Sequence, residues 1–208
     1  MNSAAMKPLL KTWLRARRCA RDMLEDRSAV AGTEFAVIVP IMLLLFFGTV
    51  EFSSAVAVDR KVTLIARTLS DLTSQSPPAG VFDTDLTNYF AAANGVMTPY
   101  TPPIYPAVNA TISELWIDPN SLQARVQWSR GNAPRATSTI VTIPPNLAVP
   151  GTYLIYSEVN VRYTPTVGYV MAPAGVNLSD VSYTRPRQAA CVIYPASTSG
   201  TTPPCPTL

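Results

Sequence analysis

A single carboxylate, Glu34, stands directly in front of the longest apolar run of the chain, residues 35–50. Moving an ionised carboxylate into hydrocarbon costs about 2.5–3.5 kcal/mol on insertion scales, so a carboxylate at this place needs a partner or the lipid headgroups. Two interpretations follow from the residues alone. Either Glu34 pairs with a positive charge, or it lies in the first turn of a helix at headgroup level, where a negative charge suits the helix dipole.

Few other residues have types and spacings that suggest catalysis. The chain contains no His, which removes the usual base for a Ser nucleophile and a common zinc ligand. We find no acid–base pair that would converge in a pocket, so we expect no enzyme, no metal and no cofactor. Asp83 and Asp85 offer a cation site only as a second choice, because carboxylates at the start of a helix are more often capping residues.

Two of the three cysteines, Cys191 and Cys205, lie near the C-terminus, whereas Cys19 lies in the basic N-terminal stretch. A disulfide between Cys191 and Cys205 would close a loop of about 15 residues and add about 3 kcal/mol on chain-entropy arithmetic. We expect this disulfide, because two free thiols on the exported side would be a liability. The alternative is two unrelated thiols.

The apolar run predicts one membrane span. Residues 35–50 carry no charge, and after Glu51 the chain stays mostly apolar as far as Val58, which gives the roughly 20 residues that a bilayer requires. Pro40 is tolerated when neighbours satisfy the carbonyl that it frees. The positive-inside rule explains the basic residues before the run better than nucleic-acid binding does. They are Lys7, Lys11, Arg15, Arg17, Arg18, Arg21 and Arg27.

The helix is predicted to continue beyond the membrane, from about Thr33 to Thr73, because apolar residues recur there every three or four positions. This stripe needs a cover, which is either the chain's own C-terminal domain or another subunit. The Ser/Pro/Gly-rich residues 74–80 end the helix. The stripe consists of Phe52, Ala55, Val58, Val62, Ile65, Leu69 and Leu72.

The remaining chain predicts an α+β fold with an antiparallel sheet. A short helix is expected from Asp83 to Ala93, ended by Asn94-Gly95. Period-two alternation indicates strands, including one that places Leu122, Ala124, Val126 and Trp128 on one face. The strands are expected at 111–117, 122–128, 138–143, 153–163 and 190–194, the first two as a hairpin. The domains are then a basic leader (1–29), a transmembrane and extended amphipathic helix (30–75), and a Pro-rich, β-rich domain (76–208).

One set of motifs resembles a known family. Between Gly32 and Phe52 the chain carries Glu34-Phe35-Ala36, Pro40 inside the apolar run, and Gly48-Thr49-Val50-Glu51-Phe52. Together with the basic leader, these resemble the TadE family of pilus-assembly proteins, which are pseudopilins of the bacterial tight-adherence (Flp, type IVb) pilus system. The resemblance covers about residues 27–70. It implies a pilin-like arrangement in which the sheet domain packs on the outer half of the long helix.

The resemblance also implies processing. A prepilin peptidase would cut between Ala29 and Val30, where the family usually has Gly instead of Ala29. The new amino terminus at Val30 would pair with Glu34 of an adjacent subunit inside the membrane, and each charge would offset the burial cost of the other. Glu51 would then lie near the opposite interface, and headgroup exposure is its expected state.

The expected function is therefore that of a membrane-anchored pseudopilin or minor pilin that helps to assemble a tight-adherence pilus. Its partners would be the membrane, the prepilin peptidase, other pilins and the assembly machinery, with no nucleic acid. It would span the bacterial inner membrane once, with a cytoplasmic N-terminus and a periplasmic or extracellular C-terminal domain. The alternative is an unprocessed single-span anchor whose exported β domain binds a ligand or an envelope partner.

Overall fold

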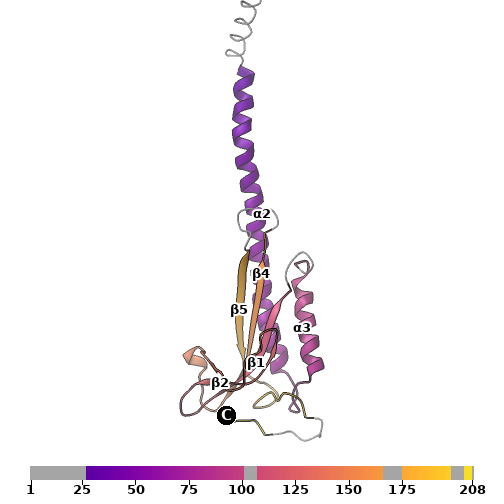
Figure 1. Cartoon of the computed structure of the whole chain (residues 1–208), viewed down its shortest axis with the longest axis vertical. Coiled ribbons are helices and arrows are strands. Elements are labelled where there is room, and N and C mark those ends of the chain that lie inside the picture. Colours follow the sequence, from indigo (N-terminus) through magenta and orange to yellow (C-terminus); the bar gives the residue numbers. More distant parts are fainter. Residues whose placement is uncertain (1–26, 101–106, 166–174, 198–203, 208) are drawn as a thin grey trace, which may run out of the picture. The chain divides into compact units, whose positions relative to one another are not determined.

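The computed structural model describes residues 27–100, 107–165, 175–197 and 204–207. The fold is α+β, with a long N-terminal helix and a five-stranded antiparallel sheet (Figure 1). The chain divides into two compact units, one up to Val50 and one from Glu51 onward. Apart from its last three residues, the expected leader 1–29 lies outside the described part.

The long helix, α2, runs from Arg27 to Ser74. It begins before the predicted start at Thr33, because alanines favour helix and a single glycine, which costs about 1 kcal/mol, does not interrupt a long helix. It ends where predicted. The Gln75 N–H still donates to the carbonyls of Asp71 and Leu72, and the prolines that follow Ser76 have no N–H to continue the ladder.

The sheet has the strand order β3-β2-β1-β4-β5, and every neighbouring pair is antiparallel. The predicted hairpin is formed by β1 and β2, and the predicted strand 153–163 coincides with β4. A short 3₁₀ helix, η1, lies between β3 and β4. The bounds are β1 Asn109–Ile117, β2 Ala124–Gly131, β3 Ile140–Val141, η1 Pro145–Leu147, β4 Tyr153–Tyr163 and β5 Val176–Thr184.

The predicted last strand, 190–194, is wrong, and β5 takes its place. The segment at 190–194 lies outside the sheet because its backbone pairs with the loop before α3: Val81 N–H donates to the carbonyl of Ile193, and Ala196 N–H donates to that of Val81. β5 pairs with β4 along its whole length. Its alternation is weak in the sequence, because most of its residues are polar on both faces.

The predicted single face of Leu122, Ala124, Val126 and Trp128 is also wrong. Leu122 has a positive φ of 56° and is exposed. A β-bulge then pairs Leu115 with Val126 but Glu114 with Trp128, so Gln127 has no partner on β1. The extra residue turns Trp128 to the opposite face from Val126, and this places the indole beside Glu114.

The outer half of α2 packs on one face of the sheet. Val58, Val62, Ile65 and Leu69 are at most 1% exposed and share a core with sheet residues. The chain's own domain therefore covers this part of the predicted apolar stripe, whereas Phe52 at its start is 72% exposed. The sheet residues of this core include Ile112, Trp128, Ile155, Val159 and Val161. A second apolar cluster contains Leu115, Ile117, Val126, Val141 and Leu154.

The second helix, α3, runs from Asp83 to Met97 and does not stop at Asn94-Gly95 as predicted. Met97 is fully buried, so its packing favours one more helical turn. The carbonyls at this end are bound by Lys61 of α2, whose Nζ donates to Val96 O at 2.9 Å and to Thr98 O at 2.6 Å. A cation at a helix C-terminus also suits the helix dipole.

Gly131 and Gly95 make a matched pair for testing the backbone. Gly131 has a φ of +139°, and an added Cβ would lie 2.2 Å from the carbonyl oxygen of Ala110, whereas a Cβ on Gly95 would meet nothing within 4 Å. We expect Gly131→Ala to lower the free energy of unfolding by roughly 1–3 kcal/mol and Gly95→Ala to raise it by about 0.5–1 kcal/mol. Urea unfolding of the full chain in detergent measures both changes. If the two substitutions changed the free energy of unfolding equally, the positive φ of Gly131 and its close approach to Ala110 would be contradicted.

Candidate functional site

The residues expected to act in processing and assembly lie at the start of α2. Ala29 and Val30 are already helical, so a peptidase would have to unwind this first stretch to reach the bond between them. Val30 is exposed, and its carbonyl accepts a hydrogen bond from Thr33 Oγ1 at 2.8 Å. Glu34 is four residues after Val30, which places the two on the same face of the helix.

Glu34 is exposed to the surroundings of the helix. None of the ion pairs in the described part of the chain includes it. Because α2 begins at Arg27, Glu34 lies beyond the first turn, and the predicted first-turn position is wrong. The dipole effect falls off within that turn. A favourable charge for this carboxylate must therefore come from a group beyond the described residues of this chain or from the lipid headgroups.

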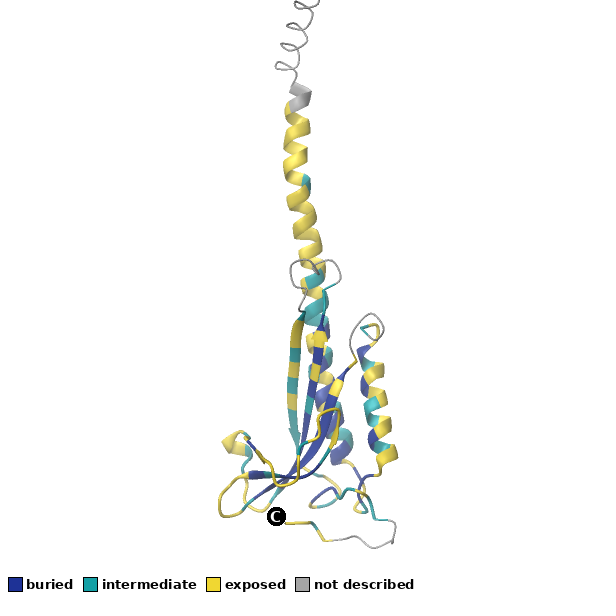
Figure 2. Ribbon diagram, in the orientation of Figure 1, coloured by how far each residue is buried: buried dark blue, intermediate teal, exposed yellow. Residues whose placement is uncertain are grey.

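The first half of α2 is a candidate membrane span. Its apolar window has a mean hydropathy of 2.3, and none of that window is buried in the protein. Figure 2 shows this part of the helix as exposed around its whole circumference. A helix that exposes apolar side chains on all sides suits lipid rather than water. The exposed side chains include Phe35, Ile38, Met42, Leu45 and Phe46.

Glu51 begins the part of α2 that contacts the sheet. The Tyr163 hydroxyl at the end of β4 donates a hydrogen bond to Glu51 Oε2 at 2.9 Å, and Glu51 is half-buried. The expected state of simple headgroup exposure is therefore wrong. This contact joins the end of β4 to α2. Before Glu51 the helix exposes apolar side chains on all sides, and after Glu51 its buried apolar side chains lie on the side that faces the sheet.

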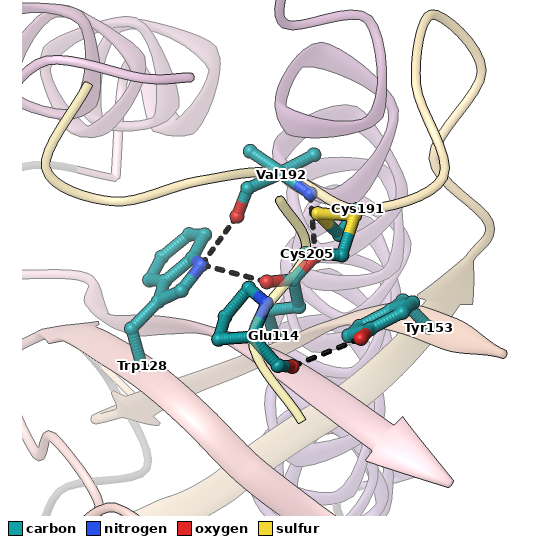
Figure 3. The surroundings of a disulfide bond; sticks show 7 residues. Glu114, Trp128, Tyr153, Cys191, Val192 and Cys205 are labelled. Atoms are coloured by element: carbon teal, nitrogen blue, oxygen red, sulfur yellow. Dashed lines mark hydrogen bonds between the residues drawn. A yellow bond between two sulfur atoms is a disulfide. The ribbon is translucent and has the colours of Figure 1, made fainter. Parts of the chain in front are cut away.

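The C-terminal segment is bound to the sheet by a disulfide and a buried carboxyl group (Figure 3). Cys191 and Cys205 form the disulfide. Glu114 of β1 is fully buried; its Oε1 accepts from the Val192 N–H at 2.5 Å and its Oε2 from Trp128 Nε1 at 3.1 Å. The same indole N–H donates to Val192 O at 2.7 Å. Tyr153 Oη completes the contact by donating to Pro206 O at 2.9 Å.

Glu114 is shifted strongly towards its protonated form. Burial raises its pKa to about 8, and the hydrogen bonds from Val192 and Trp128 oppose this rise only partly. Burial, together with the nearby charge of Glu114, also raises the pKa of Tyr153. Its described neighbours are two hydrogen-bond donors, a phenol and a disulfide, all of which suit a structural contact. We therefore interpret Glu114 as an anchor for the C-terminal segment.

Sequence reasoning missed Glu114, although a signal was available. Ala110, Ile112, Glu114 and Trp116 alternate along β1, and three of these four side chains are apolar. A carboxylate inside an apolar alternation indicates a buried, hydrogen-bonded group rather than a solvent-facing one. The bulge that supplies Trp128 as its partner has no comparable signal.

The cation alternative for Asp83 and Asp85 does not fit their contacts. Asp83 Oδ1 accepts from Arg130 and from the Tyr194 hydroxyl, both at 2.6 Å, and the bonds from Tyr194 and then Arg130 lower the pKa of Asp83. Asp85 Oδ2 accepts from the Phe82 N–H, which is the capping role expected for an acid in the first turn. Across the described residues, no group of three or more potential metal ligands occurs.

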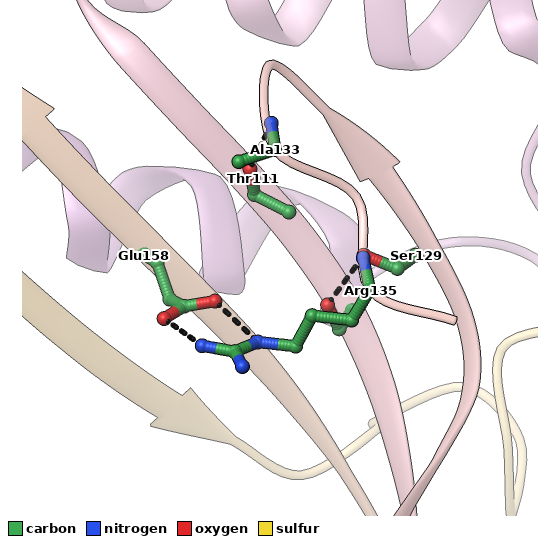
Figure 4. Close-up of polar contacts among 6 residues, drawn as sticks. Thr111, Ser129, Ala133, Arg135 and Glu158 are labelled. Atoms are coloured by element: carbon green, nitrogen blue, oxygen red, sulfur yellow. Dashed lines mark hydrogen bonds and ion pairs between the residues drawn. The ribbon is translucent and has the colours of Figure 1, made fainter. Parts of the chain in front are cut away.

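A second arginine is also paired. Arg135 holds Glu158 of β4 with two hydrogen bonds, from Nε at 2.8 Å and from Nη2 at 2.5 Å, beside Thr111 and Ser129 (Figure 4). The backbone N–H groups of Ala133 and Arg135 donate to the hydroxyls of Thr111 and Ser129. These bonds hold the loop after β2 against the sheet, which is a structural role.

The buried Glu114 predicts a pH-dependent stability. Its folded pKa of about 8 lies above the ordinary glutamate pKa of 4.5, so between these two values the folded state holds a proton that the unfolded state has lost. Stability is then highest below pH ~4.5 and decreases by about 1.4 kcal/mol per pH unit until the pH passes the folded pKa. Glu114→Gln should remove this slope between pH 5 and 8. Asp118→Asn, at a carboxyl whose pKa is lowered, should shift the urea midpoint equally at every pH in this range.

The disulfide closes a loop with a sequence separation of 14, for which chain entropy predicts a contribution of about 3 kcal/mol. Replacing both cysteines by serine should lower the free energy of unfolding by about this amount and loosen the segment that covers Glu114. Urea unfolding with and without dithiothreitol measures the effect. The reductant should destabilise the wild-type chain and leave the double variant unchanged, and an unaffected wild-type chain would contradict the role of this disulfide.

Comparison with known proteins supports the N-terminal motifs. Residues 30–69 match the family model described as TadE-like protein. No curated protein and no solved structure matches the chain. The match begins at Val30 and includes Glu34, the candidate span and the outer half of α2 as far as Leu69, which confirms the resemblance predicted from the motifs over this range. Over residues 30–69, which form most of α2, the chain is therefore similar to TadE-like proteins.

Proposed function

We propose that this chain is a membrane-anchored pseudopilin or minor pilin that takes part in assembling a tight-adherence (Flp) pilus. One observation carries the proposal: the TadE-like segment, residues 30–69, coincides with a helix that is apolar on all sides in its first half and packs on its own sheet in its second half. Such a helix leaves its membrane half available for contact with lipid or with other helices.

The proposed mechanism starts with processing between Ala29 and Val30 by a prepilin peptidase. The cut creates a positive amino terminus at Val30, and this charge pairs with the Glu34 carboxylate of an adjacent subunit. An isolated charge in hydrocarbon is costly, whereas a pair offsets much of that cost. Because the favourable pair forms at one axial offset between neighbours, it also sets the register of the subunits.

The proposed topology follows the charge distribution. The basic residues of the leader (1–29) stay in the bacterial cytoplasm, the helix (30–75) crosses the inner membrane once, and the β-rich domain (76–208) lies on the periplasmic or extracellular side. The disulfide between Cys191 and Cys205 supports this placement, since disulfides persist in oxidising compartments.

The alternative function is that of an unprocessed single-span anchor whose exported domain binds a ligand or an envelope partner. Ala29 favours it, because the family usually has Gly at this position. The intact mass and N-terminal sequence of the protein from its native membrane distinguish the two. A chain that begins at Val30 supports the pseudopilin, whereas a chain that begins at Met1 supports the anchor and leaves Glu34 without its amine partner.

Glu34→Gln tests the assembly role, because it keeps the size of the side chain and removes its charge. We expect the number of pili to fall by about tenfold or more, while the amount of the protein in the membrane stays unchanged. The reason is that a loss of about 1.4 kcal/mol at one subunit contact weakens that contact tenfold. Asp59→Asn, at an exposed carboxylate on the same helix, is the matched control and should leave pilus counts normal. Normal counts for Glu34→Gln would remove the assembly role.

A further inference from the structure

The two edges of the sheet differ in how they are protected. On one side, β3 is only two residues long, Ile140–Val141, and Pro144 and Pro145 follow it closely. On the other side, β5 is nine residues long and contains no Pro, Gly, Lys or Arg. Short strands, prolines and charged residues are the usual means by which a protein prevents its sheet edges from pairing with other chains. β3 is protected by its shortness and by the prolines that follow it, whereas β5 is long and carries one charged residue, Asp180.

Among the described residues, outward backbone groups of β5 lack backbone partners along its outer edge. The Val181 N–H points away from β4 and is bound by the carboxylate of its own neighbour, Asp180, at 2.8 Å. Backbone direction alternates along a strand, so Asn177 and Ser179 point the same way as Val181. Neither makes an outward backbone hydrogen bond to any part of the chain that the structure describes. Apart from the donor that Asp180 covers, the edge is a template for another strand.

An open trough lies between α2 and the C-terminal end of β5. It has a volume of about 470 Å³ and is lined by residues of α2 and by Ser182 and Thr184 of β5. Figure 1 shows β5 at the margin of the sheet, next to β4. The α2 residues that line the trough are Arg67, Thr68, Asp71 and Leu72. Leu64 lies one turn before Thr68 on the same helix face and is 53% exposed.

We propose that the outer edge of β5 binds an extended segment of a different exported polypeptide, which adds to the sheet as a sixth strand. Neighbouring strands are about 4.8 Å apart, so the added strand would lie over the trough. Its main chain would pair with the outward groups of Asn177 and Ser179. Alternate side chains would face α2, where apolar residues would cover Leu64 and Leu72.

A second copy of this chain is the poorer occupant. Asp180 is at the centre of β5, so a symmetric antiparallel pair of β5 strands would place the two Asp180 side chains opposite each other, which is unfavourable. That pair would also direct the Glu51 ends of the two α2 helices away from each other. Two chains anchored in one membrane need both ends at the same side, which disfavours this pairing and favours a strand from another polypeptide.

Site-specific photocrosslinking in the native cells tests this proposal with the full chain. Benzoylphenylalanine replaces either Val181 on β5 or Ile140 on β3; both positions are exposed and apolar, and they lie on opposite edges of the sheet. Adducts are mapped to the residue by mass spectrometry. A third chain combines the label at Val181 with Ser179→Pro, which removes an outward N–H without breaking the ladder to β4.

We expect an adduct from position 181 that maps to one defined segment of another exported chain, loss of that adduct with Ser179→Pro, and no such adduct from position 140. A synthetic peptide of the mapped segment should then slow hydrogen exchange at Asn177 and Ser179 in the purified full chain. The proposal is overturned by the absence of an adduct at 181, by an adduct with a second copy, by an adduct that persists with Ser179→Pro, or by a peptide that leaves exchange unchanged. None of these readouts depends on pilus assembly. The β5 proposal can therefore be overturned while the proposed function still holds.

Discussion

The packing of the outer half of α2 on the sheet is the contact on which the rest of the domain depends. Val62 and Ala66 are completely buried there, and the small side chain of Ala66 leaves its carbonyl accessible to the Ser157 hydroxyl of β4, which donates to it at 2.5 Å. The contact fixes which face of the sheet is covered and therefore which sides its two edges occupy. It also explains Ser157, which lies between the apolar Ile155 and Val159 on this face of β4, as the hydrogen-bond donor that matches this carbonyl.

Around that contact, the domain adds a few long-range polar anchors to its apolar core. Lys61 holds the end of α3, Tyr163 holds Glu51, and Glu114 holds Val192. Lys61 and Glu114 fasten irregular segments, whereas Tyr163 joins the end of β4 to α2. The anchor at Glu114 differs from the others because a charge there would be fully buried. The neutral form avoids that cost, so the C-terminal segment is held most firmly when the carboxyl is protonated.

Features governed by local pattern were predictable, whereas those governed by tertiary contact were not. The helix and the strand 153–163 follow from apolar periodicity, which is strong where one face is buried. β5 was missed because an edge strand with one half-covered face has little apolar alternation to detect. The bulge at Gln127 was missed because a two-against-one register depends on the partner strand. At the candidate site, the sequence identified Glu34 and both C-terminal cysteines, but it could not reveal that Trp128 would turn towards Glu114.

The helix and the sheet place two different requirements for partners on one chain. In the membrane half, Glu34 has no ion-pair partner among the described residues, and hydrocarbon makes such a charge costly. In the outer half, outward backbone groups of β5 lack a backbone partner among the described residues, and the cost in water is small because water can bind them. If the chain assembles as proposed, a contact of Glu34 in the membrane is therefore the stronger constraint, whereas the β5 edge can remain open until a suitable strand reaches it. A protein that assembles through its helix would still have its sheet edge available to select a neighbour.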